Sequence, residues 1–242
     1  MIYHARTSSP MKAEIQRKLK AAQVFCFDVD STVLTVEGID ELAELAGVAD
    51  AVKKLTTAAM EGRMTYHSAL RQRLEIIKPS RSLIAKFHSL NPPTHQLSPN
   101  VRQLIKLLHD RGATVYLVSG GFMELIAPVA AALDIPLDNV YANSLRWTID
   151  GQFSSFDPQS WTAVAGGKKR ALEHIRHLHA ADATASSKVS GVSNEKHASD
   201  MGVTLVMIGE GGHFTAALLL LYCQRPPASI CVRILLQVLH VS

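Results

Sequence analysis

The sequence is poor in cysteine, and its cysteines show no metal-site or redox spacing. Cys26, Cys223 and Cys231 are the whole set in 242 residues, which excludes a disulfide framework. Such usage indicates a reducing compartment or indifference to redox conditions. Long apolar runs are also absent, because the longest candidate, Ala216 to Cys223, is far shorter than the ~20 residues of a membrane helix. We therefore expect no membrane partner.

Charge of one sign is not concentrated anywhere either. Lys and Arg number 25 against 21 Asp and Glu, and the net charge is +4. No basic tract is dense enough to predict nucleic-acid binding. We expect a cytoplasmic protein. Residues 1–10 hold no acid and several hydroxyl side chains, so a plastid location is the alternative if they are part of a transit peptide.

Hydrophobic residues make up 47% of the chain, which is ample for a core. Short apolar runs that suggest buried strands stand at Val24 to Phe27, Thr114 to Val118, about 140–142 and Val203 to Ile208. Amphipathic helical patterns separate most of them, and this alternation favours an α/β fold with a mostly parallel sheet. Residues 39–90 are instead helical in pieces at about 39–46, 50–60, 66–77 and 80–89. That stretch is too long for a simple crossover, so we expect a small inserted helical domain.

Turn residues predict several further boundaries. Ser98, which precedes a proline, suits the N-cap of a helix. The Ser119–Gly121 segment is expected to turn the chain from a strand into a helix at roughly 122–133, which would place backbone amides at a natural anion site. A last helix should end near His179. The Ala- and Ser-rich residues 180–202 are then expected to form a mobile surface loop.

Polar side chains follow three of the expected strands. Asp28 and Asp30 leave the first strand as a pair separated by one residue, and alternate residues of extended chain point the same way. Carboxylates this close repel unless a cation or a shared proton relieves them, and a hard divalent cation such as Mg²⁺ suits oxygen ligands. One carboxylate can then act as nucleophile and the other as general acid and base. Ser119 and Glu210 also follow strands, so Asp28, Ser119 and Glu210, at three strand ends, are expected to converge at one sheet edge.

At these residues the sequence resembles a known family. DVDST at 28–32 matches the DxDx(T/V) motif of haloacid-dehalogenase-superfamily phosphatases. VFCFDVDSTV, EGIDELAELAGV, AVKKLTTAAMEG, ALRQRLEIIKPS, VSGGFMELI and VYANSL are similar to phosphoserine phosphatases. The similarity covers residues 20 to about 180 and returns at Val203 to Gly209.

The resemblance implies the architecture of the chain. It predicts a HAD-like Rossmannoid core with a mostly parallel sheet, made of residues 1–37 and 98–210, and an inserted helical cap at 38–97. Residues 211–242 would be a divergent tail. The resemblance also leaves a homodimer open.

The resemblance further assigns catalytic roles. Asp28 would attack phosphorus and carry an aspartyl-phosphate. Asp30 would protonate the leaving serine oxygen and then activate water, and both would be ligands of Mg²⁺. Ser119 and Gly120 would bind phosphate oxygens, and Lys168 would neutralise the phosphate and the nucleophile, since phosphoryl transfer depends on positioning and charge neutralisation.

Substrate choice would depend on the cap, again by resemblance. Glu37 would meet the substrate ammonium and Arg73 its carboxylate, a pairing that guanidinium geometry suits. Met60 and Tyr66 would wall the pocket, although the family often has Phe at the second position. Arg71 beside Arg73 is an equally visible candidate, and so is Lys169 beside Lys168; the residues alone do not separate the members of either pair.

The chain departs from the family after Gly209. The last family motif, GDGxxD, reads GEGGHF here, so Glu210 replaces the aspartate that would bind Mg²⁺ and Phe214 replaces the second aspartate. Residues 211–242 contain no acid and lack resemblance to the family. Either they are a divergent folded ending, or they are a foreign tail from splicing or a shifted reading frame.

The expected function is Mg²⁺-dependent hydrolysis of O-phospho-L-serine to L-serine and phosphate, the last step of serine biosynthesis. The alternative is a catalytically impaired or inactive variant that still binds a phosphate ligand or a partner. Glu210, Phe214 and the tail are the features that divide the two.

Overall fold

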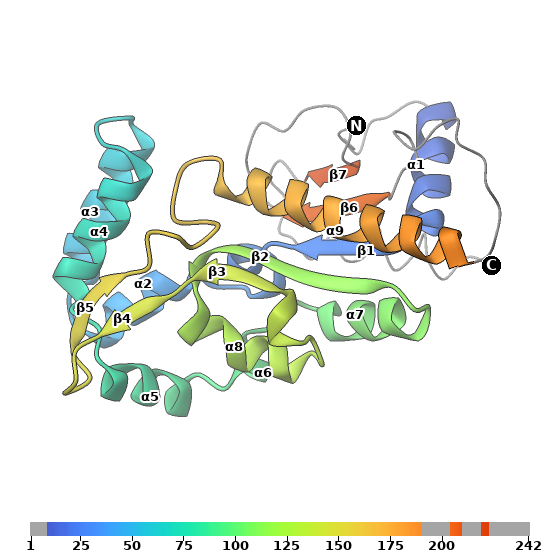
Figure 1. The fold of residues 1–242 in the computed structure, drawn as a ribbon. Helices are drawn as coiled ribbons and strands as arrows, with labels where there is room; N and C mark the ends of the chain where they lie inside the picture. The colour runs from blue at the N-terminus through green and yellow to red at the C-terminus, as the bar shows by residue number, and fades with distance from the viewer. Residues whose placement is uncertain (1–8, 190–203, 210–218, 223–242) are drawn as a thin grey trace.

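The computed structural model describes residues 9–189, 204–209 and 219–222, and within them five parallel strands form one sheet (Figure 1). The strands are β1 (Val24–Phe27), β2 (Thr114–Phe122), β3 (Val140–Asn143), β6 (Leu205–Gly209) and β7 (Leu219–Tyr222), in the spatial order β3-β2-β1-β6-β7. The expected α/β class with a mostly parallel sheet is confirmed. β1 is the central strand, so its carboxyl end lies at the middle of the sheet edge.

Helices cover both faces of this sheet. The core helices are α1 (Ser9–Ala21), α7 (Val101–Asp110), α8 (Met123–Ala132) and α9 (Gly167–Val189). Figure 1 shows α9 on one face and α7 and α8 on the other. Val24 and Cys26 of β1 pack toward α9, whereas Phe25 and Phe27 pack toward α7 and α8. All four side chains are fully buried, which explains why the strand is an unbroken apolar run.

The stretch between β1 and α7 is helical, as expected. It contains α2 (Gly38–Leu45), α3 (Ala49–Met60), α4 (Tyr66–Ile77), α5 (Arg81–Leu90) and the short α6 (Pro93–Gln96). Leu42, Leu70 and Leu74 from these helices build a second apolar cluster, separate from the core below the sheet. The antiparallel hairpin of β4 (Leu145–Trp147) and β5 (Phe153–Phe156) packs on the same cluster. The domain boundaries at 37/38 and 97/98 stay a prediction.

The expected turn at Ser119–Gly121 is wrong, because these residues continue strand β2. Pairing with β3 shifts register between Val118 and Phe122, which then pairs with Asn143. Glycines tolerate such an irregularity, since they carry no Cβ to clash. Helix α8 begins only at Met123, so the Ser119–Gly121 amides do not belong to a helix N-terminus.

Helix α7 also starts later than expected. Ser98 is buried, its N–H donates to Val33 O at 2.8 Å, and its carbonyl accepts from Val101 N at 3.1 Å. The N-cap is Asn100, at a φ of 66°. Ser98 therefore ties the chain to the end of the turn after β1 instead of capping the helix.

Helix α9 runs past its expected end. It continues from His179 to Val189, so residues 180–189 are helical and the predicted loop at 180–202 is wrong over that part. The segment is rich in alanine and has no Gly or Pro before Gly191, so nothing in it breaks a helix. Residues 190–202 lie outside the described residues.

Most of the tail also lies outside the described residues. The exception is β7 (Leu219–Tyr222), which pairs in parallel with β6 from Val206↔Leu219 to Gly209↔Tyr222. Both interpretations of the tail stay predictions.

Glu124 joins three parts of the molecule at the start of α8. Its Oε1 accepts a hydrogen bond from Leu145 N at 2.9 Å, and its backbone carbonyl lies 2.8 Å from His88 Nε2 of α5. Its Oε2 is buried and has no partner among the described residues. Burial raises the pKa of this carboxyl, against the lowering effects of its hydrogen bonds and of Arg81.

We expect Glu124→Gln to stabilise the protein at neutral pH. The pKa of Glu124 in the folded protein lies above the ordinary 4.5. Its contribution to the free energy of unfolding is therefore complete below pH 4.5 and is lost as the pH rises through the folded pKa. Glutamine keeps an acceptor for Leu145 N and carries no charge. The variant should match wild type well below pH 4.5 and should gain stability over it as the pH rises through the folded pKa toward 8.

Urea unfolding of both proteins across that range measures the difference. At the acidic end both side chains are neutral, so the two proteins should nearly match there. A difference that stays constant across the range would contradict the assignment.

Candidate active site

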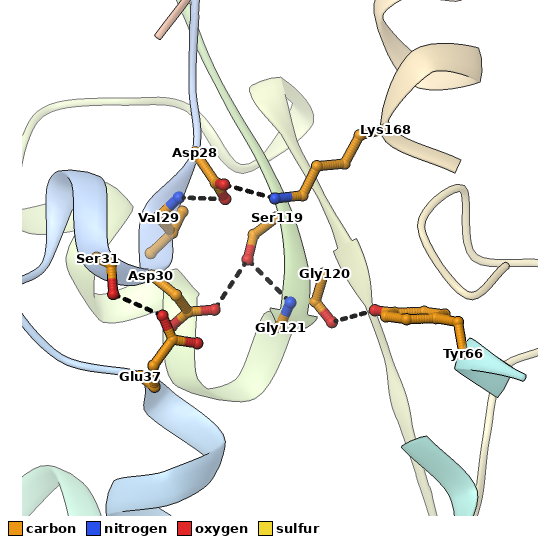
Figure 2. Close-up of polar contacts among 10 residues, drawn as sticks. All are labelled: Asp28, Val29, Asp30, Ser31, Glu37, Tyr66, Ser119, Gly120, Gly121 and Lys168. Carbon is orange, nitrogen blue, oxygen red and sulfur yellow. Dashed lines mark hydrogen bonds and ion pairs between the residues drawn. The ribbon is translucent and has the colours of Figure 1, made fainter. Parts of the chain in front are cut away.

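Asp28 caps the turn that follows the central strand. The turn, Val29–Val33, closes with Leu34 N donating to Val29 O at 2.9 Å, and Ser31 lies in the left-handed region at a φ of 54°. Asp28 is buried, with 9% of its side chain exposed. Its Oδ1 accepts from Val29 N at 2.9 Å and its Oδ2 from Lys168 Nζ at 2.6 Å (Figure 2). Burial raises its pKa, and Lys168 partly offsets that rise.

Asp30 lies beside Asp28 although the backbone between them is not a regular strand. Its Oδ1 accepts from Gly38 N at 2.9 Å and its Oδ2 from Ser119 Oγ at 3.4 Å. Burial raises its pKa; the Gly38 N–H opposes this, and the Asp28 charge adds to it. A buried carboxyl with a raised pKa is suited to hold a proton and to donate it.

The Ser119–Gly121 segment passes directly over Asp30. Gly121 N donates to Ser119 Oγ at 2.9 Å, and Tyr66 OH donates to the Gly120 carbonyl at 3.2 Å (Figure 2). A Cβ on Gly120 would lie 2.7 Å from the Tyr66 hydroxyl oxygen, and one on Gly121 only 3.1 Å from Asp30 Oδ2. A side chain at Gly120 would therefore displace the Tyr66 hydroxyl, and one at Gly121 would press on Asp30. Tyr66 has its pKa raised, chiefly by burial.

A cavity of about 260 Å³ opens between these groups and the helical insert. Its lining includes Asp28, Asp30 and Lys168 at one end and Glu37, Tyr66 and Arg73 toward the insert. Glu37 accepts from Ser31 Oγ at 2.6 Å, and partial desolvation raises its pKa, with a smaller effect from Asp30. Arg73 is half-buried, and its Nε donates to Ala69 O at 3.3 Å. The cavity thus offers both signs of charge to a small polar ligand.

The structure shows which member of each pair of neighbouring cations faces the cavity, which the sequence alone did not decide. Arg73 lines the cavity, while Arg71 is exposed and pairs with Glu75 at 3.0 Å on the outer face of α4. Lys168 reaches Asp28, while Lys169 is exposed and lies 3.9 Å from Glu173. Arg71 and Lys169 therefore serve as controls for their neighbours.

Oxygen donors for a hard cation are present at the end of β1. Asp28 and Asp30 offer two carboxylates, and a Cβ on Gly209 would come within 2.8 Å of Asp28 Cβ, so the chain at Gly209 passes against Asp28. This donor chemistry fits Mg²⁺. Among the described residues no three His, Cys, Asp or Glu side chains gather as a metal site. The expected third ligand, Glu210, lies outside the described residues, as does Phe214.

The other predicted residues are partly described. Met60 ends α3, and its side chain lies outside the description. The cavity lining and the hydrogen bond from Ser119 to Asp30 bring the remaining predicted residues together. They are Asp28, Asp30, Glu37, Tyr66, Arg73, Ser119, Gly120 and Lys168.

Two buried residues behind the cavity were not foreseen as part of the site. Asn143 Nδ2 donates to the Gly120 carbonyl at 2.7 Å, and Thr162 Oγ1 donates to Asn143 Oδ1 at 3.1 Å. Asn143 ends β3, so the rule that polar residues after parallel strands gather at one edge could have found it. Thr162 gives no such signal, because it lies in a loop.

Comparison with known protein families places this fold in one of them. A model of the family described as haloacid dehalogenase-like hydrolase matches residues 22–177, and the chain belongs to that family. It resembles the phosphoserine phosphatases within it: the human phosphoserine phosphatase is 40% identical over 164 residues, which span 68% of this chain and 72% of the human one. An enzyme of the phosphatase class is thereby confirmed.

Solved structures agree with the sequence comparison. A substrate-bound phosphoserine phosphatase complex superposes with a TM-score of 0.57 at 26% identity, and covers 78% of each chain. A phospho-aspartyl intermediate analogue of phosphoserine phosphatase gives 0.56 at 27% identity with the same coverage. No described helix of this chain is long and apolar enough to cross a membrane.

Proposed function

We propose that this chain hydrolyses O-phospho-L-serine to L-serine and phosphate. The observation that carries the proposal is the Asp28 carboxylate, buried at the end of the central strand and held 2.6 Å from Lys168 Nζ in a cavity lined by both acids and bases. The substrate carries a phosphate, a carboxylate and an ammonium. Lys168, Arg73 and Glu37 provide one opposite charge for each.

The chain's own residues can divide the reaction into two displacements. An Asp28 oxygen attacks phosphorus, the bond from phosphorus to the serine oxygen breaks, and Asp30 gives its proton to that oxygen. Water then attacks the aspartyl-phosphate and gives a proton back to Asp30, which releases phosphate and restores Asp28. Ser119 and Gly120 would hold phosphate oxygens while Lys168 offsets their charge.

A magnesium ion would be held by Asp28, Asp30 and Glu210. When bound, it would supply positive charge at the phosphate oxygens. Glutamate is longer than aspartate by one C–C bond, ~1.5 Å, and Mg²⁺ demands near-ideal octahedral geometry.

The direct test is phosphate release from O-phospho-L-serine by the purified full chain, with and without Mg²⁺. Mg²⁺-dependent release is expected. A folded protein that releases no phosphate at any Mg²⁺ concentration would contradict the proposal.

A second candidate is favoured by Glu210 and Phe214 at the last motif. In it the chain binds a phosphomonoester without turning it over. Saturable binding of inorganic phosphate by a protein that shows no release would support this candidate over the first.

Arg73→Met is expected to lower kcat/KM for O-phospho-L-serine by ~10²-fold, because a charge-assisted pair with the substrate carboxylate is lost. The loss should be absent with p-nitrophenyl phosphate, which has no carboxylate. Arg71→Met, on the same helix but facing solvent, is the matched control and should leave both substrates unaffected. Equal losses with the two substrates would argue that Arg73 acts on the phosphate or on the fold.

The remaining expectations are part of the same proposal. The reaction would serve serine biosynthesis, in a cytoplasmic protein or, with a transit peptide at residues 1–10, a plastid one. A homodimer stays open.

A further inference from the structure

Asn143 is a buried amide that does not line the cavity, yet both of its ends are bonded. It is 0% exposed, and Thr162, its partner, is 2% exposed. Its Nδ2 donates to the Gly120 carbonyl at 2.7 Å and its Oδ1 accepts from Thr162 Oγ1 at 3.1 Å. A buried polar pair whose donors and acceptors are all hydrogen-bonded holds its side chains in one orientation, because any other orientation leaves a buried donor or acceptor unpaired.

The bond to Gly120 sets the direction of a peptide at the phosphate end of the cavity. In a trans peptide the C=O and the following N–H point in opposite directions. The Gly120 carbonyl is held by Asn143 Nδ2 and by Tyr66 OH, so the Gly121 N–H points away from both donors, and there it donates to Ser119 Oγ. Two consecutive glycines have no Cβ to prevent the peptide from flipping. Asn143 supplies that restraint from behind.

The bond to Thr162 reaches the other side of the site. Thr162 packs against the first residue of α9: a Cβ on Gly167 would lie 2.3 Å from Trp161 O and 2.8 Å from Thr162 Cα. The next residue is Lys168, whose Nζ lies 2.6 Å from Asp28 Oδ2. Thr162 is thus bonded to Asn143 and packed against the start of the helix that carries the lysine.

We propose that Asn143 and Thr162 form a positioning pair that holds the Gly120–Gly121 peptide in register with Lys168. The pair touches no reacting atom and acts through these two groups. Where it concerns turnover, the inference rests on the proposed function. Where it concerns phosphate binding, it stands on the geometry alone.

Three variants test the pair. Asn143→Asp keeps the shape and the acceptor for Thr162 but cannot donate to Gly120. Thr162→Val removes the hydroxyl at nearly constant volume, and Thr162→Ser retains it. We expect Asn143→Asp to lower kcat/KM by ~10²-fold and Thr162→Val by ~10-fold, with Thr162→Ser close to wild type.

The loss should be equal for O-phospho-L-serine and p-nitrophenyl phosphate, because the pair acts on the phosphate end. This separates it from Arg73, whose loss is confined to the amino acid substrate. Thermal unfolding of each variant checks that the fold is intact. Wild-type kinetics in a folded Asn143→Asp protein, or a Thr162→Ser protein as impaired as Thr162→Val, would overturn the inference.

Calorimetric titration with inorganic phosphate keeps the inference testable without turnover. If wild type fails to hydrolyse O-phospho-L-serine, the proposed function fails, and the phosphate titration then decides the pair. Two results would support the pair: Asn143→Asp binds phosphate more weakly than wild type, and Thr162→Ser binds it more tightly than Thr162→Val. Equal affinities in all four proteins would overturn it.

Discussion

Asp28→Asn should abolish phosphate release from O-phospho-L-serine, with kcat lowered by ~10⁴-fold or more. Asparagine matches aspartate in shape, and its amide oxygen can still accept from Val29 N, which lies 2.9 Å from the carboxylate. An amide oxygen is a far weaker nucleophile, however, and it cannot form an ion pair with Lys168. The fold should therefore survive while the chemistry is lost.

Mass spectrometry of acid-quenched protein gives a second readout of the same variant. Wild type mixed with substrate should carry a phosphoryl group, and Asp28→Asn should not. Asp40→Asn, which changes an exposed carboxylate on α2, is the matched control and should behave as wild type. A phosphorylated Asp28→Asn protein, or one with readily measured turnover, would show that another residue attacks phosphorus.

The site carboxylates could be foreseen because their signal is local. A fully buried apolar strand ends at Phe27, and the chain must leave the sheet edge immediately afterwards. Asp28 and Asp30 therefore had to lie near that edge whatever the rest of the fold. The shape of the chain here was not foreseen: extended chain was expected from Asp28 to Asp30, but Val29–Val33 form a turn, with Ser31 just after Asp30 at a φ of 54°.

The choice between neighbouring cations depends on information that the residues alone do not hold. Residues two apart on a helix point ~200° away from each other, so Arg71 and Arg73 cannot face the same side. Which of them faces the cavity depends on how α4 packs. Leu70 and Leu74 are buried on its inner side, and that burial turns Arg73 toward the cavity.

Helix and strand ends were harder to foresee than their existence, for a similar reason. The glycines after Val118 suggest a turn, yet pairing of Phe122 with Asn143 keeps the chain in the sheet. Ser98 is a good N-cap by type, but its N–H is committed to Val33 O. In both places a contact with a segment distant in sequence overrides the local preference.

Lys168→Met is expected to lower kcat by ~10³-fold, because the cation is placed where negative charge gathers in the transition state. The Lys168 side chain is 31% exposed and the Asp28 side chain only 9%, so the lysine charge acts on a group with little screening from water. The affinity for inorganic phosphate, measured by calorimetry, should fall in the same variant. This second loss follows because the ammonium is the one cation at the phosphate end of the cavity lining that the structure describes.

Lys169→Met is the matched control. Its ammonium is exposed and lies 3.9 Å from Glu173 four residues along the helix, a surface pair worth about 0.3–0.5 kcal/mol at most. Both rate and phosphate affinity should stay at the wild-type level. If the two variants lost activity equally, the first turn of α9 would have to be oriented differently, with Lys169 as well as Lys168 near Asp28. Phosphate affinity would then identify the lysine that supplies the charge, because only a lysine beside the phosphate can change it strongly.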